Sequence, residues 1–424
     1  MALRSRRASV PAPLGENAQE TRPNGYYLRI SEGYMRAKYI LLVLLAVYLV
    51  FMLAKYRDDI TYENMMYLLR DFSAGETEYS NVFEPVKYDE QDNMTYALFR
   101  GELAVAGNRT VAMYNSSGTL ARRYETAFEN PVLASSDKYL IAYDLGDTKY
   151  AVYNSITKVS GGDAPGTVED ADINDRGDHI LVCRSDETKY VVYAYNSSFR
   201  NTAKYYKNKY VTCAAVGRSA ADVLICATEL SGGSPSFEVE FYKSGDEAPA
   251  YTYSDSGTIP VRCGTWRDGS YYVLCTDRIL FFSESGSLVR TVSAHAFGYS
   301  ALSAGESTLA LSADNDALGE KSSLFVFDTA GELLYNGVVD DSISSVSAFG
   351  GVLYALGNGS AYRVSYSGAD AGSVYRIDVP EDSGVILADG VSAVICGKSM
   401  AFGFTESDSD AEVTDENTTS QKEQ

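Results

Sequence analysis

Histidine is the scarcest chemically active residue in this chain. Only His179 and His295 occur among 424 residues. A Ser-His-Asp triad or a Cys-His dyad needs a histidine in a cleft, and a histidine-rich transition-metal site needs several histidines. His179 opens an expected strand just after a turn, and His295 follows a strand edge. We therefore expect both at the surface or in turns.

The six cysteines form a clearer pattern. Four end the same strand in four repeats, and two lie in the strand before it: Cys183, Cys226, Cys275 and Cys396, then Cys213 and Cys263. Hairpin turns centred near residues 219 and 268 put Cys213 opposite Cys226 and Cys263 nearly opposite Cys275. These pairs are either cross-strand disulfides of an oxidising compartment or small buried hydrophobes. The absence of any C-x-x-C excludes zinc-ribbon and thioredoxin chemistry.

Two clusters of oxygen donors suggest calcium. They are Asp172, Asn174, Asp175 and Asp178, and then Asp314, Asn315, Asp316 and Glu320. Neither follows the twelve-residue calcium loop. The first cluster coincides with a strand turn, where Asp and Gly are common anyway. The second lies in a long loop that is matched by the loop from Thr228 to Ser236, and such loops are either binding loops or plain insertions.

Charge limits the classes of partner. The chain carries 57 acidic and 36 basic side chains, for a net charge of −21. Such a protein repels nucleic acid and other polyanions, which leaves neutral glycans, peptides, cations and basic protein surfaces. Glycosidase chemistry needs two carboxylates at a set separation, but no feature selects one pair among 57. We assign no catalytic, cofactor-binding or metal-ligating residue from the sequence, and we expect no cofactor.

A repeat of about forty residues must position all of these groups. Compare TVAMYNSSGTLARR from Thr110, RILFFSESGSLVRT from Arg278 and SLFVFDTAGELLYN from Ser323. Each is an apolar strand ending in an aromatic residue, then a polar turn with Gly, then a second strand. The period is that of a four-stranded propeller blade. Val, Ile, Tyr, Phe and Thr dominate, which favours an all-β domain.

Eight such units occur, and the last, which ends at Phe404, lacks a fourth strand. The extended segment NVFEPVKY (Asn81–Tyr88) precedes the first unit. A ring of blades has no open edge when an N-terminal strand completes the C-terminal blade. We therefore predict an eight-bladed β-propeller over residues 80–405, closed by Val82–Tyr88. Seven blades is the alternative, and an open solenoid is disfavoured because no capping repeat is visible.

An apolar run from Tyr39 to Ala54 predicts a single membrane span over residues 37–56. The leader before Tyr39 holds seven cationic and three acidic side chains. Cationic flanks stay in the cytoplasm, so we predict an uncleaved signal anchor in the plasma membrane, with the propeller extracytoplasmic. Residues 1–36 are expected to be a basic disordered leader, residues 57–79 a juxtamembrane helix and linker, and residues 406–424 an acidic disordered tail.

The leader, the anchor, the stretch YRDDITYENMMYLLRDF (Tyr56–Phe72) and the blade pattern AYDLGDTKYAVYNS (Ala142–Ser155) together resemble an uncharacterised bacterial family. Its members are membrane-anchored, propeller-like extracytoplasmic proteins. The resemblance covers nearly the whole chain. It implies the fold and the topology, and it implies no activity.

Three functions follow as hypotheses. The first is a non-catalytic binding or scaffolding module of the cell envelope, whose partner is an envelope protein or a neutral glycan. The second is an extracytoplasmic carbohydrate-active enzyme that uses a carboxylate pair on the propeller face. The third is a sensor that couples an external ligand to a cytoplasmic partner through the leader.

Overall fold

The computed structural model describes residues 25–55 and 83–404, except 244, 294–298, 306, 317–318, 369 and 389–392. The chain divides into two units, Met1–Tyr79 and Ser80–Gln424. The predicted juxtamembrane helix and linker (57–79) and the acidic tail (406–424) lie outside the described residues.

One helix, α1 (Gly25–Lys55), is the described part of the first unit. Its segment Gly33–Phe51 is long and apolar enough to cross a membrane, as the sequence predicted. The helix begins twelve residues before the predicted span, so the expectation of a disordered leader up to residue 36 is wrong for residues 25–36. Because Leu28, Arg29, Met35 and Ala37 are good helix formers and no proline lies between Pro23 and the end of the helix at Lys55, the helix extends through this stretch.

The second unit is an eight-bladed β-propeller, so the seven-blade alternative is wrong. Each blade is a four-stranded antiparallel sheet of strands consecutive in sequence, except the last. Blade 1 holds β2 (Thr95–Phe99), β3 (Glu102–Ala106), β4 (Thr110–Tyr114) and β5 (Leu120–Glu125). Blade 2 holds β6 (Pro131–Ser135), β7 (Tyr139–Asp144), β8 (Lys149–Asn154) and β9 (Lys158–Asp163). Blade 3 holds β10 (Val168–Ile173), β11 (His179–Arg184), β12 (Tyr190–Tyr195) and β13 (Asn201–Lys207).

Blade 4 holds β14 (Tyr210–Val216), β15 (Val223–Ser231), β16 (Ser234–Tyr242) and β17 (Tyr251–Ser256). Blade 5 holds β18 (Pro260–Thr265), β19 (Tyr271–Cys275), β20 (Arg278–Phe282) and β21 (Leu288–Ser293). Blade 6 holds β22 (Ala301–Ala304), β23 (Thr308–Asp314), β24 (Ser322–Asp328) and β25 (Leu333–Val339). Blade 7 holds β26 (Ser345–Phe349), β27 (Val352–Leu356), β28 (Ser360–Ser365) and β29 (Val374–Asp378). Blade 8 holds β30 (Ser383–Ala388), β31 (Ala393–Gly397), β32 (Met400–Gly403) and β1 (Val86–Lys87).

The N-terminal strand closes the ring, as predicted. Strand β1 pairs with β32, with Val86 opposite Ala401 and Lys87 opposite Met400. Phe83 extends the pairing, since its carbonyl accepts a hydrogen bond from the Gly403 amide at 3.0 Å. Phe83 and Val86 are buried in the core that joins blades 8 and 1. Blade 8 therefore gains its fourth strand from the opposite end of the domain.

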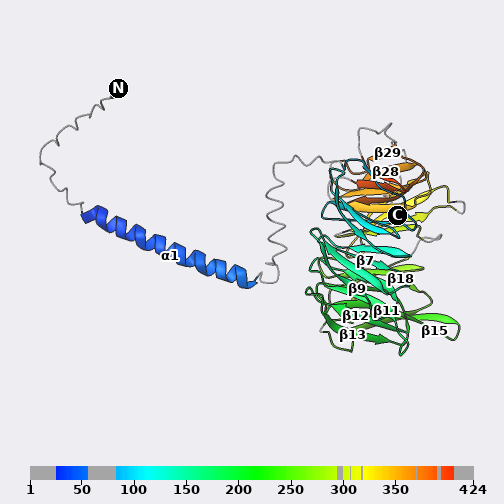
Figure 1. Cartoon of the computed structure of the whole chain (residues 1–424), viewed down its shortest axis with the longest axis horizontal. Coiled ribbons are helices and arrows are strands. Elements are labelled where there is room, and N and C mark those ends of the chain that lie inside the picture. Colours follow the sequence, from blue (N-terminus) through cyan, green and yellow to red (C-terminus); the bar gives the residue numbers. More distant parts are fainter. Residues whose placement is uncertain are drawn as a thin grey trace, which may run out of the picture. The chain divides into compact units, whose positions relative to one another are not determined.

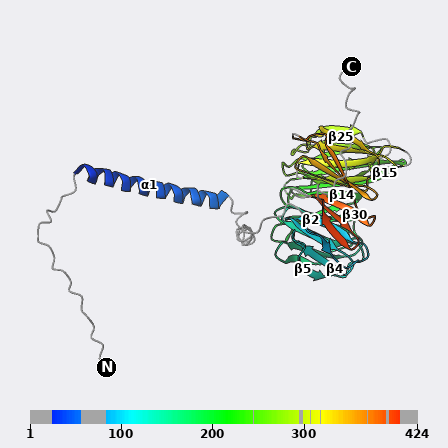
Figure 2. The same ribbon diagram turned by 90° about the horizontal axis from the view of Figure 1, so that it is seen from above.

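The first strand of each blade lies innermost and the fourth lies outermost. Figure 2 shows β2, β14 and β30 toward the middle of the domain and β5 and β25 at its periphery. Separate apolar cores fill the spaces between neighbouring blades, because alternate residues of the middle strands face opposite neighbours. The second strands are buried along nearly their whole length, which is why their sequences are continuous apolar runs.

Side chains of one inner strand cap the free edge of the next. The acceptors are Asp170 and Asp172 for the Ala214 and Val216 amides (3.2 and 2.9 Å), and Ser345 and Ser347 for the Ile386 and Ala388 amides (3.1 and 2.9 Å). These bonds satisfy edge amides that no further strand pairs. The same device therefore joins blade 3 to blade 4 and blade 7 to blade 8.

Candidate functional site

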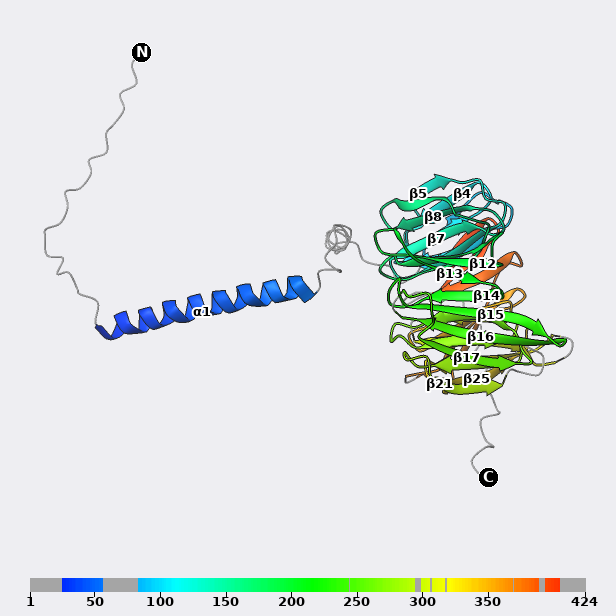
Figure 3. The same cartoon turned by 90° about the horizontal axis from the view of Figure 1, so that it is seen from below.

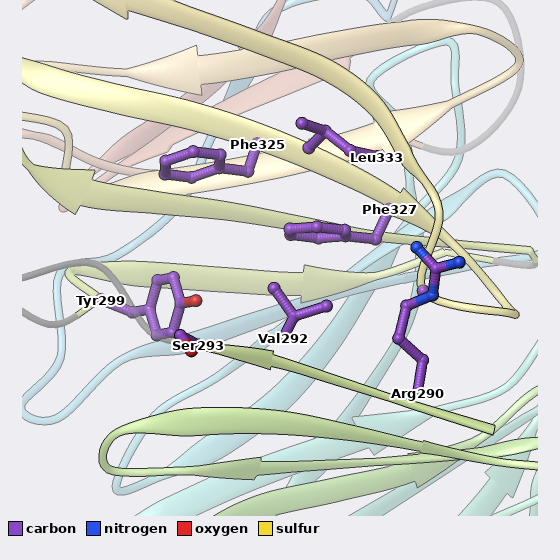
Figure 4. A pocket seen from close by; sticks show the side chains of 8 residues that line it. Arg290, Val292, Ser293, Tyr299, Phe325, Phe327 and Leu333 are labelled. Carbon is purple, nitrogen blue, oxygen red and sulfur yellow. The ribbon is translucent and has the colours of Figure 1, made fainter. Parts of the chain in front are cut away.

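A groove opens between blades 5 and 6. It has a volume of about 370 Å³ and is lined by Arg290, Val292, Ser293, Tyr299, Phe325, Phe327, Gly331 and Leu333. Figure 4 shows the aromatic and aliphatic side chains on both sides of the hollow. Its size lies within the range typical of small-ligand and side-chain pockets.

Strand alternation builds the groove. On β24, Leu324 and Val326 face the core toward blade 7, whereas Phe325 and Phe327 face blade 5. Val292 of the outermost strand β21 faces them from the other side. The groove is thus the outer end of the apolar core between the two blades.

The floor of the groove is held by close packing. Gly331 lies in the turn between β24 and β25 with φ of +77°. A Cβ atom there would lie 2.6 Å from the ring of Phe281, which is fully buried beneath it. Only glycine meets both the backbone conformation and the close approach. The turn is therefore fixed against the core and holds Leu333 at the groove.

One ion pair crosses the groove. The Arg290 guanidinium on β21 donates to the Glu332 carboxylate, which lies beside Leu333 at the start of β25. Both side chains are partly exposed, so the pair adds little stability, but it links blades 5 and 6 beside the opening. Of the eight lining residues, Arg290 is the one that carries a charge at neutral pH.

Exposed apolar side chains continue beyond the groove. Leu288 and Val289 on β21 are 38% and 53% exposed, and Leu333, Leu334 and Val338 on β25 are 51%, 44% and 50% exposed. Both strands are the outermost of their sheets and have no further strand paired to them among the described residues. Five exposed large apolar side chains therefore lie on the two outer strands that flank the groove.

His179 is a correction to the sequence analysis. It is fully buried at the start of β11, not at the surface. Its ring stacks on Tyr195 with centroids 4.8 Å apart, and its Nδ1 lies 3.1 Å from the Gly177 carbonyl. Burial lowers its pKa to about 4, so the ring is neutral at physiological pH. The sequence analysis expected exposure because His179 follows a turn, but this first residue of β11 faces the core. His295 lies outside the described residues.

The first acid cluster is a hairpin turn, as the turn interpretation predicted. The Asn174 side chain accepts from the Asp178 amide at 3.1 Å, and Gly177 adopts φ of +81°. Asp175 accepts from the Asp137 amide of blade 2 at 2.9 Å. Asp172 points elsewhere, because it caps the edge of β14. The structure therefore separates this cluster into structural roles.

The second cluster also lies in a hairpin connection, between β23 and β24. The Asp316 carboxylate accepts from the Glu320 amide at 3.1 Å, and the Asn315 amide donates to the Lys321 carbonyl at 2.8 Å. Residues 317–318 of this connection are outside the described part of the chain. Both interpretations of this loop, binding and plain insertion, stay open.

The predicted loop from Thr228 to Ser236 is instead a long hairpin. Thr228 pairs with Phe237 and Ser231 with Ser234, so β15 and β16 each run for nine residues. Gly232 and Gly233 both have positive φ and form the two-residue turn. Figures 1 and 3 show the end of β15 projecting from the domain.

The cysteines follow the predicted register in one pair and depart from it in the other. Cys213 lies opposite Cys226, as expected. Cys263 lies opposite Val273, two residues from Cys275, and Cys275 pairs with Pro260 across a bulge, so the second pair is near but not directly opposite. All six cysteines are free thiols, five of them buried and Cys263 half-buried.

Sequence reasoning missed the groove. The sequence signal for the groove was Phe325, a second aromatic residue two positions before Phe327, which occupies the aromatic position of the repeat. The extra aromatic at i−2 is large and faces the same neighbour as the repeat residue. The groove itself depends on how two blades meet, which no single repeat encodes.

Comparison with solved structures supports the fold. A computationally designed protein, Ika8, superposes with a TM-score of 0.58 at 11% identity over 75% of this chain and 98% of its own. AztD from Citrobacter koseri gives a TM-score of 0.50 at 10% identity, over 72% and 90% of the two chains. BamB from Moraxella catarrhalis gives 0.49 at 11% identity, over 76% and 98%. The support for the fold comes from Ika8 and AztD, and at these identities the similarity concerns the fold alone.

No curated protein matches the sequence significantly. A sequence profile does match residues 76–369, which is more than half of the chain and includes the closing strand and blades 1 to 6. The bacterial family resemblance and the propeller fold are both consistent with that match. The chain belongs to a family of unknown function, DUF5711.

Proposed function

We propose that this protein is a membrane-anchored, non-catalytic binding module of the cell envelope. Its partner is another envelope protein, which places an apolar side chain in the groove between blades 5 and 6. The observation that carries the proposal is that groove, with aromatic walls at the outer edge of two sheets.

The chemistry of the groove favours binding over catalysis. Arg290 is held by Glu332, and a guanidinium offers N–H donors but no acceptor, so it does not suit the role of a general base. The remaining walls are aromatic, aliphatic or hydroxyl-bearing. Phe and Tyr supply large contact areas that bury well against an apolar partner residue.

The outer strands suggest how the partner arrives. Strand β21 presents an edge with no further strand paired to it in the described residues. An extended segment of a partner that adds to such an edge gains main-chain hydrogen bonds, while every second side chain points to one face. A segment on β21 would then direct an apolar side chain toward Val292 and Phe327. The acidic charge of this chain favours a segment with flanking Lys or Arg residues.

The anchor supplies the location. Helix α1 carries the apolar segment Gly33–Phe51, and basic residues dominate the sequence before it. Under the positive-inside rule this arrangement keeps the N-terminus in the cytoplasm and exports the propeller. The partner is accordingly a protein on the outer face of the plasma membrane or in the cell wall. The enzyme and sensor alternatives stay hypotheses that no contact in the described residues favours.

Paired photo-crosslinking positions test the proposal. A photoreactive residue replaces Leu333 in the full chain in living cells, and the matched control replaces Leu334. The two positions are adjacent on β25 and similarly exposed, but only Leu333 lines the groove. We expect a discrete crosslinked protein from position 333 and none from 334. Equal crosslinking from both positions, or none from either, would contradict the groove as the docking site.

A further inference from the structure

Three thiols from two blades meet beside the innermost strands. Cys213 lies on β14, Cys226 on β15 and Cys263 on β18, and their sulfur atoms all lie within 4.8 Å of one another. None of the three is close in sequence to another, and the family profile attaches no function to them.

Strand register and blade packing create the cluster. Cys213 on β14 lies opposite Cys226 on β15 within blade 4. Cys263 on β18 lies opposite Val273 and packs against the core that blade 4 shares with blade 5. The innermost strands β14 and β18 are neighbours, which brings Cys263 to the other two thiols.

Cysteine binds metals as a thiolate, so coordination by this cluster would release thiol protons.

The cluster is enclosed. Phe237, Val239 and Val273 belong to the same apolar core as the three thiols, so the site excludes most competing hard ligands. The three sulfur atoms are buried, although Cys263 as a whole residue is half-buried.

We propose that Cys213, Cys226 and Cys263 bind a single soft metal ion, with Cu(I) as the best match. Metal–sulfur bonds of about 2.3 Å place the three sulfurs of a trigonal site about 4 Å apart, close to the arrangement already present. Cu(I) accepts three sulfur donors, whereas structural zinc sites require a fourth ligand. Among the described residues no further Cys, His or carboxylate oxygen joins the cluster.

Competition titration of the full chain in detergent tests the proposal. The reduced protein is titrated with Cu(I) against a chromophoric Cu(I) chelator, and in parallel with Zn²⁺. We expect one tightly held Cu(I) per chain and an X-ray absorption spectrum with sulfur ligands only. The C213S, C226S and C263S variants should each lose affinity by more than the roughly 10–100-fold typical of a lost outer-layer partner.

Control variants separate metal loss from misfolding. C183S and C396S replace buried cysteines in blades 3 and 8, and both should bind Cu(I) like the parent chain. C263A changes the one half-buried cysteine residue of the three, so its circular dichroism should be unchanged while Cu(I) no longer raises its melting temperature. Retained binding in folded C263A, preference for Zn²⁺ over Cu(I), or a Cys213–Cys226 disulfide in protein isolated without reductant would each overturn the proposal.

Discussion

The closing strand allows a stability test with a built-in control. Phe83 and Val86 are 5% and 2% exposed and pack in the core between blades 8 and 1. Lys87, on the same strand, is exposed. The double substitution Phe83→Ala with Val86→Ala removes the apolar face of the strand and leaves its backbone in place. Lys87→Ala is the matched control.

The expected cost follows from the buried groups. Replacing a buried Phe by Ala costs about 3 to 5 kcal/mol, and removing two buried carbons from Val86 costs about 2 kcal/mol. Because both residues share one core, the sum is less than additive, and we expect about 4 to 6 kcal/mol. For a domain of this size that corresponds to roughly 10 °C in melting temperature. Lys87→Ala should change stability by less than about 0.5 kcal/mol.

Trp266 provides the readout. It is the only tryptophan, it is buried at the end of β18, and it lies in blade 5, away from the closing blade. If β1 holds the ring together, the double variant should lower the temperature of the Trp266 fluorescence transition in the full chain. A melting temperature at Trp266 that is the same for the double variant and for Lys87→Ala would refute the closing role of β1.

Further predictions concern two side chains whose pKa burial shifts and one glycine beside the groove. Burial raises the pKa of Asp170 to about 7, so the native state binds the extra proton and the contribution of Asp170 to stability should fall as pH rises from 4 through 7. Asp170→Asn, which keeps an acceptor for the Ala214 amide, should remove this contribution, so its loss of stability relative to wild type should shrink as pH rises in urea titrations. Burial lowers the pKa of His179 to about 4, so the contribution of His179 has the opposite sign and falls as pH drops below about 6.5. His179→Phe should remove roughly 2 kcal/mol of the difference between pH 5 and pH 8, whereas an unchanged difference would contradict a buried neutral ring. Gly331→Ala should cost at least about 1 kcal/mol through its positive φ and the Phe281 contact, and a neutral result would contradict the fixed turn beside the groove.

The repeat made the architecture predictable, because each blade carries the same alternation and the same turn chemistry. The unused segment before the first repeat and the missing last strand together indicated β1 and its partner β32. The Cys213–Cys226 pairing could also be predicted, since it depends only on the centre of one hairpin.

Features that depend on irregular pairing could not be predicted. The bulge between Pro260 and Arg262 places Cys275 opposite Pro260 rather than Val261, and composition gives no signal for such a shift. His179 is buried because its ring packs near Tyr150 of blade 2 and near Phe199 in the turn between β12 and β13 of its own blade. The groove between blades 5 and 6 likewise arises from side chains far apart in sequence, so its partner residues could not be assigned from either repeat alone.

The side of the membrane on which the propeller lies decides which partners it meets, and labelling tests this directly. A cysteine in place of Leu334, which is 44% exposed, is treated in intact cells with a membrane-impermeant maleimide, against the parent chain with its native cysteines and a Ser5→Cys variant in the leader. We predict labelling of L334C in intact cells and labelling of S5C only after lysis. The reverse pattern would contradict an extracytoplasmic propeller and, with it, the proposed envelope partner.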